Sequence, residues 1–84
     1  MQPDKANPEL AELSLRIGGC VRTLRQARGM SRRMLSNVSG VSERYLAQLE
    51  TGNGNVTVGI LHRLSLVFGC AVEDLVAGGA KPNL

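Results

Sequence analysis

Aromatic residues are almost missing from this chain of 84 residues, which has one tyrosine, one phenylalanine and no tryptophan. Strands of β-sandwiches favour aromatic and β-branched side chains, so a core that must be built from aliphatic residues favours a helical bundle. Hydrophobic residues make up 43% of the chain, which is enough to bury a core, and the length leaves no room for a second one. We therefore expect one small all-α domain.

Cysteine and histidine are also scarce. His62 is the only histidine, whereas a zinc site needs about four ligands, so we expect no metal and no cofactor. A single histidine with no motif around it gives no case for a catalytic triad, and we expect no enzyme. Cys20 and Cys70 lie far apart in the sequence and outside any CxxC pair. The sequence does not decide whether they form a disulfide, although buried free thiols in a reducing cytoplasm suit the pattern better.

Long hydrophobic runs are absent as well. No stretch approaches the ~18 apolar residues of a membrane span, and the beginning lacks the core of a signal peptide, so we expect a cytoplasmic protein with no membrane partner. Residues 1–8 hold two prolines and little apolar content, and we predict a flexible leader there. The domain is predicted over 9–77, and 78–84 form either a flexible tail or the start of a linker.

Positive charge is concentrated in the middle of the chain. From Arg16 to Arg63 there are eight arginines and only two acidic residues, whereas five of the seven acids lie towards the ends. A basic middle between acidic ends suggests a polyanion as partner, and arginine forks onto phosphate or guanine. Ordinary solvated charge is the alternative explanation, and the charge pattern alone leaves both open.

Apolar residues recur at three- and four-residue steps, and serine or threonine caps with glycine stops divide them into five helices. Met34, Leu35 and Val38 are expected to face inward on the second helix, and Gly18 and Gly19 are each expected to weaken the first by about 1 kcal/mol relative to alanine. The predicted helices span residues 9–28, 32–39, 42–51, 57–68 and 72–77.

The segment from residue 31 to 52 is predicted as helix, tight turn, helix, because Gly40 can supply the positive φ that such a turn needs. On a helical wheel of about 100° per residue, Leu46 and Leu49 share one face of the second of these helices. The opposite face consists of Arg44, Ala47, Gln48 and Thr51.

These outward side chains match the chemistry of base-pair edges. Arginine can fork onto guanine and glutamine onto adenine, while a small methyl group can approach the thymine methyl. An α-helix also fits the major groove, where each base pair presents its own pattern. This face therefore predicts reading of duplex DNA, with simple exposure to solvent as the alternative.

Several short motifs occur in a fixed order along the chain. They are Leu24-Arg25, Arg28-Gly29-Met30-Ser31, Gly40-Val41-Ser42, Tyr45-Leu46-x-x-Leu49-Glu50-x-Gly52 and Phe68-Gly69. From about residue 13 to 76 this pattern resembles the Cro/C1-type (XRE-like) helix-turn-helix family of phage repressors and bacterial regulators. The resemblance implies a five-helix, phage-repressor-like fold with a central helix-turn-helix. It also implies a sequence-specific regulator of transcription, a repressor or an activator, that binds double-stranded DNA with residues 42–51 in the major groove.

The resemblance further implies a role for individual residues. Breaking one partner of the implied structural ion pair, Arg25 with Glu50, would cost about 3–5 kcal/mol if the pair is buried. Ala71 stands where the family favours a capping side chain, so the fifth helix is expected to start loosely. The implied DNA-binding residues are Arg32 and Arg33 on phosphates, Glu43, Arg44 and Gln48 on bases, and Ser42, Tyr45 and Asn55 as flanking contacts.

Three wider implications follow from the family. Such modules bind as homodimers, here with a contact expected in the C-terminal helices, at Val58, Val72, Leu75 and Val76. Residues 42–58 also resemble a subgroup of regulators of aromatic-acid catabolism, in which a shikimate-kinase-like effector domain follows the DNA-binding module. Action on the bacterial nucleoid would follow from DNA binding. A protein-interaction adaptor or an antitoxin that uses the same fold is the alternative function.

Overall fold

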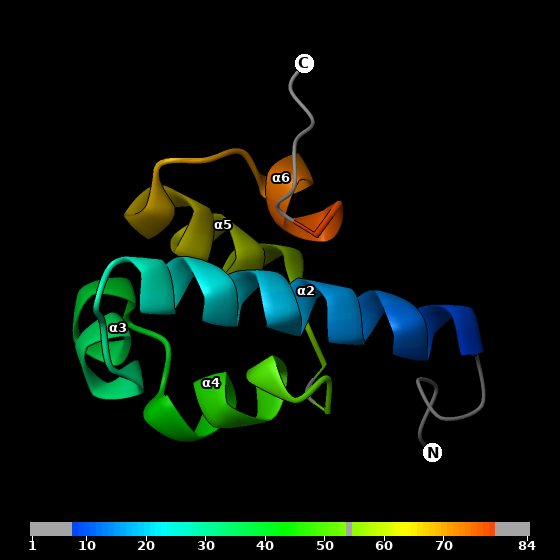
Figure 1. Ribbon diagram of the computed structural model, residues 1–84, viewed down its shortest axis with the longest axis horizontal. Coiled ribbons are helices and arrows are strands. Elements are labelled where there is room, and N and C mark those ends of the chain that lie inside the picture. The colour runs from blue at the N-terminus through cyan, green and yellow to red at the C-terminus, as the bar shows by residue number, and fades with distance from the viewer. Residues whose placement is uncertain (1–7, 54, 79–84) are drawn as a thin grey trace.

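The computed structural model describes residues 8–53 and 55–78 of the chain. Within those ranges it contains five helices and no strand, which confirms the predicted all-α fold. Figure 1 shows α2 running across the middle of the molecule, with α3 and α4 on one side and α5 and α6 on the other. The helices are α2 (Pro8–Ala27), α3 (Arg32–Ser39), α4 (Glu43–Glu50), α5 (Val58–Phe68) and α6 (Val72–Val76).

The ends of the helices lie within two residues of the predicted ones. Pro8, which the sequence placed in a leader, is the first residue of α2, where its fixed φ suits a helix start. The remainder of the predicted leader and nearly all of the predicted tail fall outside the described residues. None of the described helices combines the length and the apolar character needed to cross a bilayer.

Side-chain caps explain where the short helices begin. The hydroxyls of Ser31, Ser42 and Thr57 each accept a hydrogen bond from the amide three residues later, at 3.0–3.1 Å. Each such cap stabilises its helix by about 1 kcal/mol. The start of α6 differs from the expectation of a loose end, because the Asp74 carboxylate accepts from the Ala71 amide at 3.1 Å and so secures the first turn.

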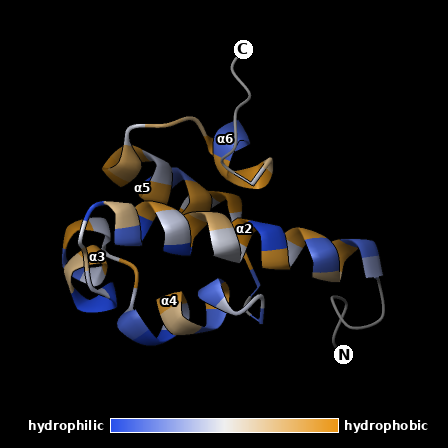
Figure 2. Ribbon diagram, viewed as in Figure 1, coloured by the Kyte–Doolittle hydropathy of each residue, from blue (hydrophilic) through white to orange (hydrophobic). Residues whose placement is uncertain are grey.

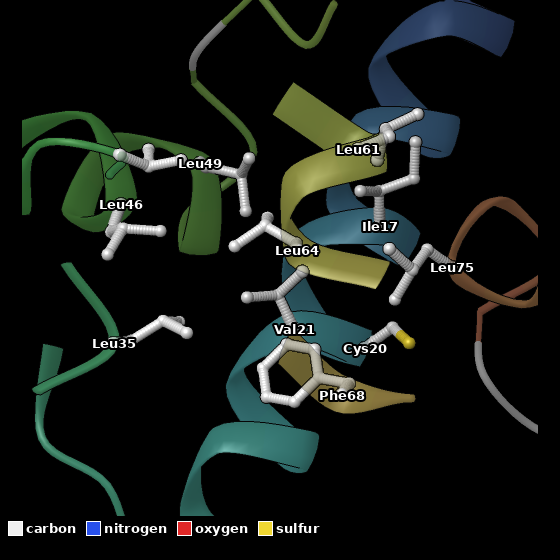
Figure 3. Close-up of a cluster of buried hydrophobic side chains, with 11 residues drawn as sticks. Ile17, Cys20, Val21, Leu35, Leu46, Leu49, Leu61, Leu64, Phe68 and Leu75 are labelled. Carbon is white, nitrogen blue, oxygen red and sulfur yellow. The ribbon is translucent and has the colours of Figure 1, made fainter. Parts of the chain in front are cut away.

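One aliphatic core holds the five helices together. Figure 3 shows side chains from α2, α5 and α6 meeting around Val21, Leu64 and Leu75, with leucines of α3 and α4 closing the other side. Because α3 and α4 are only two turns long, this shared packing is what stabilises them. The buried hydrophobic residues are Ile17, Cys20, Val21, Leu35, Val41, Leu46, Leu49, Leu61, Leu64, Phe68 and Leu75.

Two details of the predicted packing are wrong. Met34 and Val38 were expected to face inward, but they are 50% and 60% exposed, because α3 turns only its Leu35 side towards the core. Leu75 was expected at a contact between subunits, but it is fully buried within the single chain and is unavailable for that role.

Gly18 lies where α2 passes closest to α4. A Cβ atom added at Gly18 would stand 2.1 Å from the backbone oxygen of Leu49, whereas one added at Gly19 would meet nothing within 4 Å. Gly18 therefore permits the close approach of the two helices, a role that outweighs the helix-weakening effect predicted from sequence. This approach fixes the position of α4 against the body of the domain.

Cys20 and Cys70 both carry free thiols, so the disulfide that the sequence left open is not formed. The pKa of each thiol is raised, chiefly by burial and further by the negative charge of Asp74. Within the ranges that the structure describes, no three side chains of His, Cys, Asp or Glu gather in a way that would hold a metal ion.

Candidate DNA interface

The outer face of α4 carries three polar side chains that point away from the domain. Leu46 and Leu49 are completely buried beneath the helix, and Glu43, Arg44 and Gln48 are exposed. This is the orientation that the helical wheel predicted. The guanidinium, carboxamide and carboxylate groups of this face are therefore available to a partner lying along α4.

The turn before α4 sets the angle between the two helices of the motif. Gly40 has a φ of 78°, a left-handed conformation that favours glycine, and its amide donates to the Ser36 carbonyl at 2.9 Å. On the other side of the turn, Arg63 Nη1 donates to the Gly40 carbonyl oxygen at 3.3 Å. Ser42 then begins α4, with its hydroxyl oxygen accepting from the Tyr45 amide and its hydroxyl proton left for a further acceptor.

The far end of α4 is tied to α2 by the ion pair that the family resemblance implied. Arg25 Nε lies 2.7 Å from Glu50 Oε2, and Arg25 Nη2 lies 3.0 Å from Oε1, so the guanidinium and carboxylate form a two-point fork. Arg25 also donates to the Met30 carbonyl at 2.8 Å. Its hydrogen bond to Glu50 raises the pKa of Arg25, although burial acts in the opposite direction.

Arg32 joins the same carboxylate from the start of α3. Its Nε lies 3.1 Å from Glu50 Oε1, and 41% of its side chain is exposed, against 1% for Glu50. From the sequence, Arg32 was predicted to contact phosphate only. Its contact with Glu50 was not predicted, because the two residues are 18 positions apart and no local pattern signals the contact. Arg33, the next residue, is exposed and makes no ion pair among the described residues.

Tyr45 and Asn55 are brought together behind the exposed face. The Tyr45 hydroxyl donates to the Asn55 carbonyl oxygen, and its half-buried ring packs against the core. Burial raises the pKa of Tyr45, and the backbone amide of Thr57 partly offsets that effect. Tyr45 thus anchors the loop that follows α4, in which the Asn55 side chain is exposed.

A second set of hydrogen bonds closes the C-terminal end of α4. The Gln48 carbonyl accepts from the Thr51 hydroxyl at 2.8 Å and from the Asn53 amide at 2.9 Å. The Asn53 side chain in turn donates to the Thr51 hydroxyl oxygen at 3.2 Å. Asn53 was not among the residues singled out from the sequence, although asparagine after a helix end is a common turn signal.

Hydrophilic residues occur on both helices of the motif. In Figure 2, hydrophilic segments lie at the two ends of α4 and on α3, whereas α5 is mostly hydrophobic. Arginines dominate at the start of α3, where the free backbone amides of the first turn add a partial positive charge. The arrangement offers hydrogen-bonding groups on α4 beside a cationic helix start, which suits an anionic, double-helical partner.

Comparison with known proteins gives a consistent result. A sequence model of the helix-turn-helix family matches residues 21–75, which is more than half of the chain. The chain is 34% identical over 59 residues to the competence pilus inhibition repressor of Acinetobacter baylyi, covering 70% of this chain and 54% of that protein. It is also 34% identical over 58 residues to the HTH-type transcriptional regulator DdrOP3 of Deinococcus deserti, covering 69% and 45% respectively.

A solved structure shares the fold as well. The restriction-modification controller protein C.AhdI of Aeromonas hydrophila superposes with a TM-score of 0.70 at 27% identity, covering 74% of this chain and 94% of that one. The chain spans about half the length of the two regulators above. The similarity therefore concerns only part of those proteins.

Proposed function

We propose, given that this chain belongs to the helix-turn-helix family, that it regulates transcription by binding double-stranded DNA in a sequence-specific manner, without catalysing a reaction. The observation that carries the proposal is the exposed face of α4, where Glu43, Arg44 and Gln48 are open to solvent while Leu46 and Leu49 are buried beneath the helix. A helix presented in this way fits the major groove, with its polar side chains at the base edges.

The first turn of α3 supplies the sequence-independent part of the binding. Arg33 is free to reach a phosphate, and Arg32 can offer its Nη groups while Nε stays on Glu50. Such contacts set the register of the protein on the duplex without reading bases. Ser42 precedes α4 and Asn55 follows it, whereas Tyr45 lies within the helix, and we assign Tyr45 mainly to holding the loop that carries Asn55.

Selection of bound duplexes from a random pool tests the proposal. We expect a defined consensus for the unmodified protein, and Arg44→Ala should relax preference at one position, at a cost of about 1–3 kcal/mol. Arg22→Ala is the matched control, because Arg22 is an exposed arginine on α2 and lies off the α4 face. Failure to enrich any sequence, or equal effects of the two substitutions, would contradict sequence-specific reading by α4.

A homodimer is part of the same proposal. Two copies related by two-fold symmetry would place their α4 helices in half-sites about one helical turn apart. Val58, at the start of α5, is a highly exposed apolar residue and is the strongest contact residue of those considered, since Val72 and Val76 are half-buried. A palindromic consensus would support the dimer, and Val58→Asp should lower the apparent mass in sedimentation equilibrium.

Two finer assignments rest on sequence resemblance alone. Residues 42–58 are similar to the regulators of aromatic-acid catabolism, which predicts operators next to genes of that kind. The family and its bacterial relatives also favour action in the cytoplasm, on the nucleoid. Mapping of chromosomal binding sites in cells tests both assignments, and sites scattered without relation to such genes would remove the first.

A further inference from the structure

An open groove of about 520 Å³ lies away from α4, between the C-terminal ends of three other helices. Val38 of α3 and Leu66 of α5 line it and are 60% and 69% exposed, which is unusual for two aliphatic side chains that face the same hollow. Half-buried Met30 and Val67 complete the apolar lining. Exposed apolar surface with polar surroundings commonly marks a contact with another molecule.

Two arginines, Arg28 and Arg63, also line the groove. Arg28 Nη2 donates to the Phe68 carbonyl at 2.7 Å, with the guanidinium 5.4 Å from the centre of the Phe68 ring. Arg63 donates to the Gly40 carbonyl. These contacts hold both guanidiniums in place on uncharged acceptors, and neither forms an ion pair with a carboxylate in the part of the chain that the structure describes.

The groove and the proposed DNA interface use different parts of the molecule. In Figure 1 the C-terminal ends of α2 and α5 lie near α3 at one end of the domain, while α4 runs along the edge opposite to α5. On α3 itself, Arg32 and Arg33 are at the start, whereas Val38 is near the end. A partner seated in the groove would therefore leave the face of α4 free.

We propose that this groove docks an acidic, amphipathic segment of a partner protein while the domain is on DNA. An aliphatic side chain of that segment would pack on Val38 and Leu66, and its carboxylates would reach Arg28 and Arg63. Charge complementarity and apolar burial together select this occupant. Nucleic acid has no aliphatic side chain to bury, and of the undescribed segments of this chain, 79–84 contain no acid and 1–7 only one.

A displayed library of random 16-residue peptides tests the proposal on the intact chain. Peptides selected on the unmodified protein should be enriched in Asp and Glu beside Leu, Ile, Val or Phe. A synthetic copy of the best peptide should bind about tenfold more weakly to Leu66→Glu, because the new carboxylate would replace an apolar contact and repel the acidic groups of the peptide. Leu15→Glu is the matched control, because Leu15 on α2 is an apolar residue, 58% exposed, that does not line the groove.

Each outcome decides for or against the groove. The docking proposal would be overturned if the selected peptides were neutral or basic, or if no peptide were enriched. It would also be overturned if both glutamate variants weakened peptide binding equally. Peptide binding that disappears when operator DNA is added would show that the site belongs to the DNA face instead. The unmodified protein could also self-associate in a way that Leu66→Glu abolishes but that added peptide does not disturb. That result would assign the groove to a second copy of the chain. We expect both variants to bind DNA with the affinity of the unmodified protein. The docking proposal can therefore be overturned while the proposed DNA binding stands.

Discussion

Arg32 and Glu50 connect the start of α3 to the end of α4, with Arg32 Nε 3.1 Å from Glu50 Oε1. The same carboxylate is held from the other side by Arg25 at 2.7 Å. One buried negative charge is thus shared by two arginines, and the second of them stands half in solvent at the proposed phosphate-binding end of α3. Arg32 therefore both supports the two-helix motif from inside and forms part of its outer surface.

The shared role of Arg32 predicts two separable effects of Arg32→Gln. Unfolding by urea should show a loss of only about 0–1 kcal/mol, because the side chain is partly exposed and Glu50 keeps its pair with Arg25. The slope of log affinity for DNA against log salt should become shallower by about 0.9, as expected for one lost phosphate contact.

Arg33→Gln is the control for that measurement. Its side chain is exposed and makes no ion pair among the described residues, so we expect the same change in salt slope with no change in stability. If Arg32→Gln lowers stability and leaves the salt slope as it was, Arg32 has a structural role only.

The buried ion pair predicts a much larger effect inside the domain. Glu50→Gln leaves the buried Arg25 without a counter-charge, and we expect a loss of about 3–5 kcal/mol in the free energy of unfolding. The double substitution Arg25→Met with Glu50→Leu removes both charges and should recover much of that loss, because apolar replacements of buried pairs are often tolerated. A double variant as unstable as the single one would argue that the pair itself stabilises the fold.

The two neighbouring glycines of α2 should respond in opposite directions to alanine. Gly18→Ala places a Cβ against the backbone of α4, and we expect it to destabilise the domain by about 1–3 kcal/mol or more. Gly19→Ala meets open space and should stabilise the helix by up to about 1 kcal/mol. Thermal unfolding followed by circular dichroism compares the two, and similar shifts of the midpoint would contradict the close approach of α2 and α4.

The buried Cys20 thiol and the half-buried Cys70 thiol predict a loss of stability at alkaline pH. The pKa of Cys20 and that of Cys70 are raised in the folded state, so as pH rises above about 8.5 the unfolded chain loses thiol protons that the folded chain retains. Their contribution to stability is complete below that pH and is lost as pH rises towards the folded pKa values. Urea midpoints measured from pH 7 to pH 10 should fall, and the fall should be smaller for Cys20→Ala. A midpoint that rises over this range would be incompatible with burial of the thiols.

Sequence reasoning located the helices well because their signals are local. Ser31, Ser42 and Thr57 each bond to an amide three residues away, so caps can be recognised in a short window of sequence. The outward face of α4 follows from the same logic, since two leucines at helical spacing fix which side is buried. The start of α6 was judged less well, because Asp74 replaced the missing cap from inside the helix.

The groove could not be foreseen from the sequence. Val38 has the spacing of an inward residue on α3, but a two-turn helix packed by Leu35 leaves that position exposed. Nothing local shows that Leu66 of α5 would face the same hollow. Which apolar residues remain outside depends on where neighbouring helices end, and that is a property of the assembled domain.

By itself, the amino-acid sequence determined the helices of residues 8–53 and 55–78, their approximate ends and the side of α4 that turns outward, because periodicity and capping act over a few residues. Only the tertiary structure decided that Gly18 admits α4, that Arg32 shares Glu50 with Arg25, and that Arg28 and Arg63 border an exposed apolar groove. These relationships join residues far apart in the chain, and they exist only once packing has brought separate helices to fixed distances from one another.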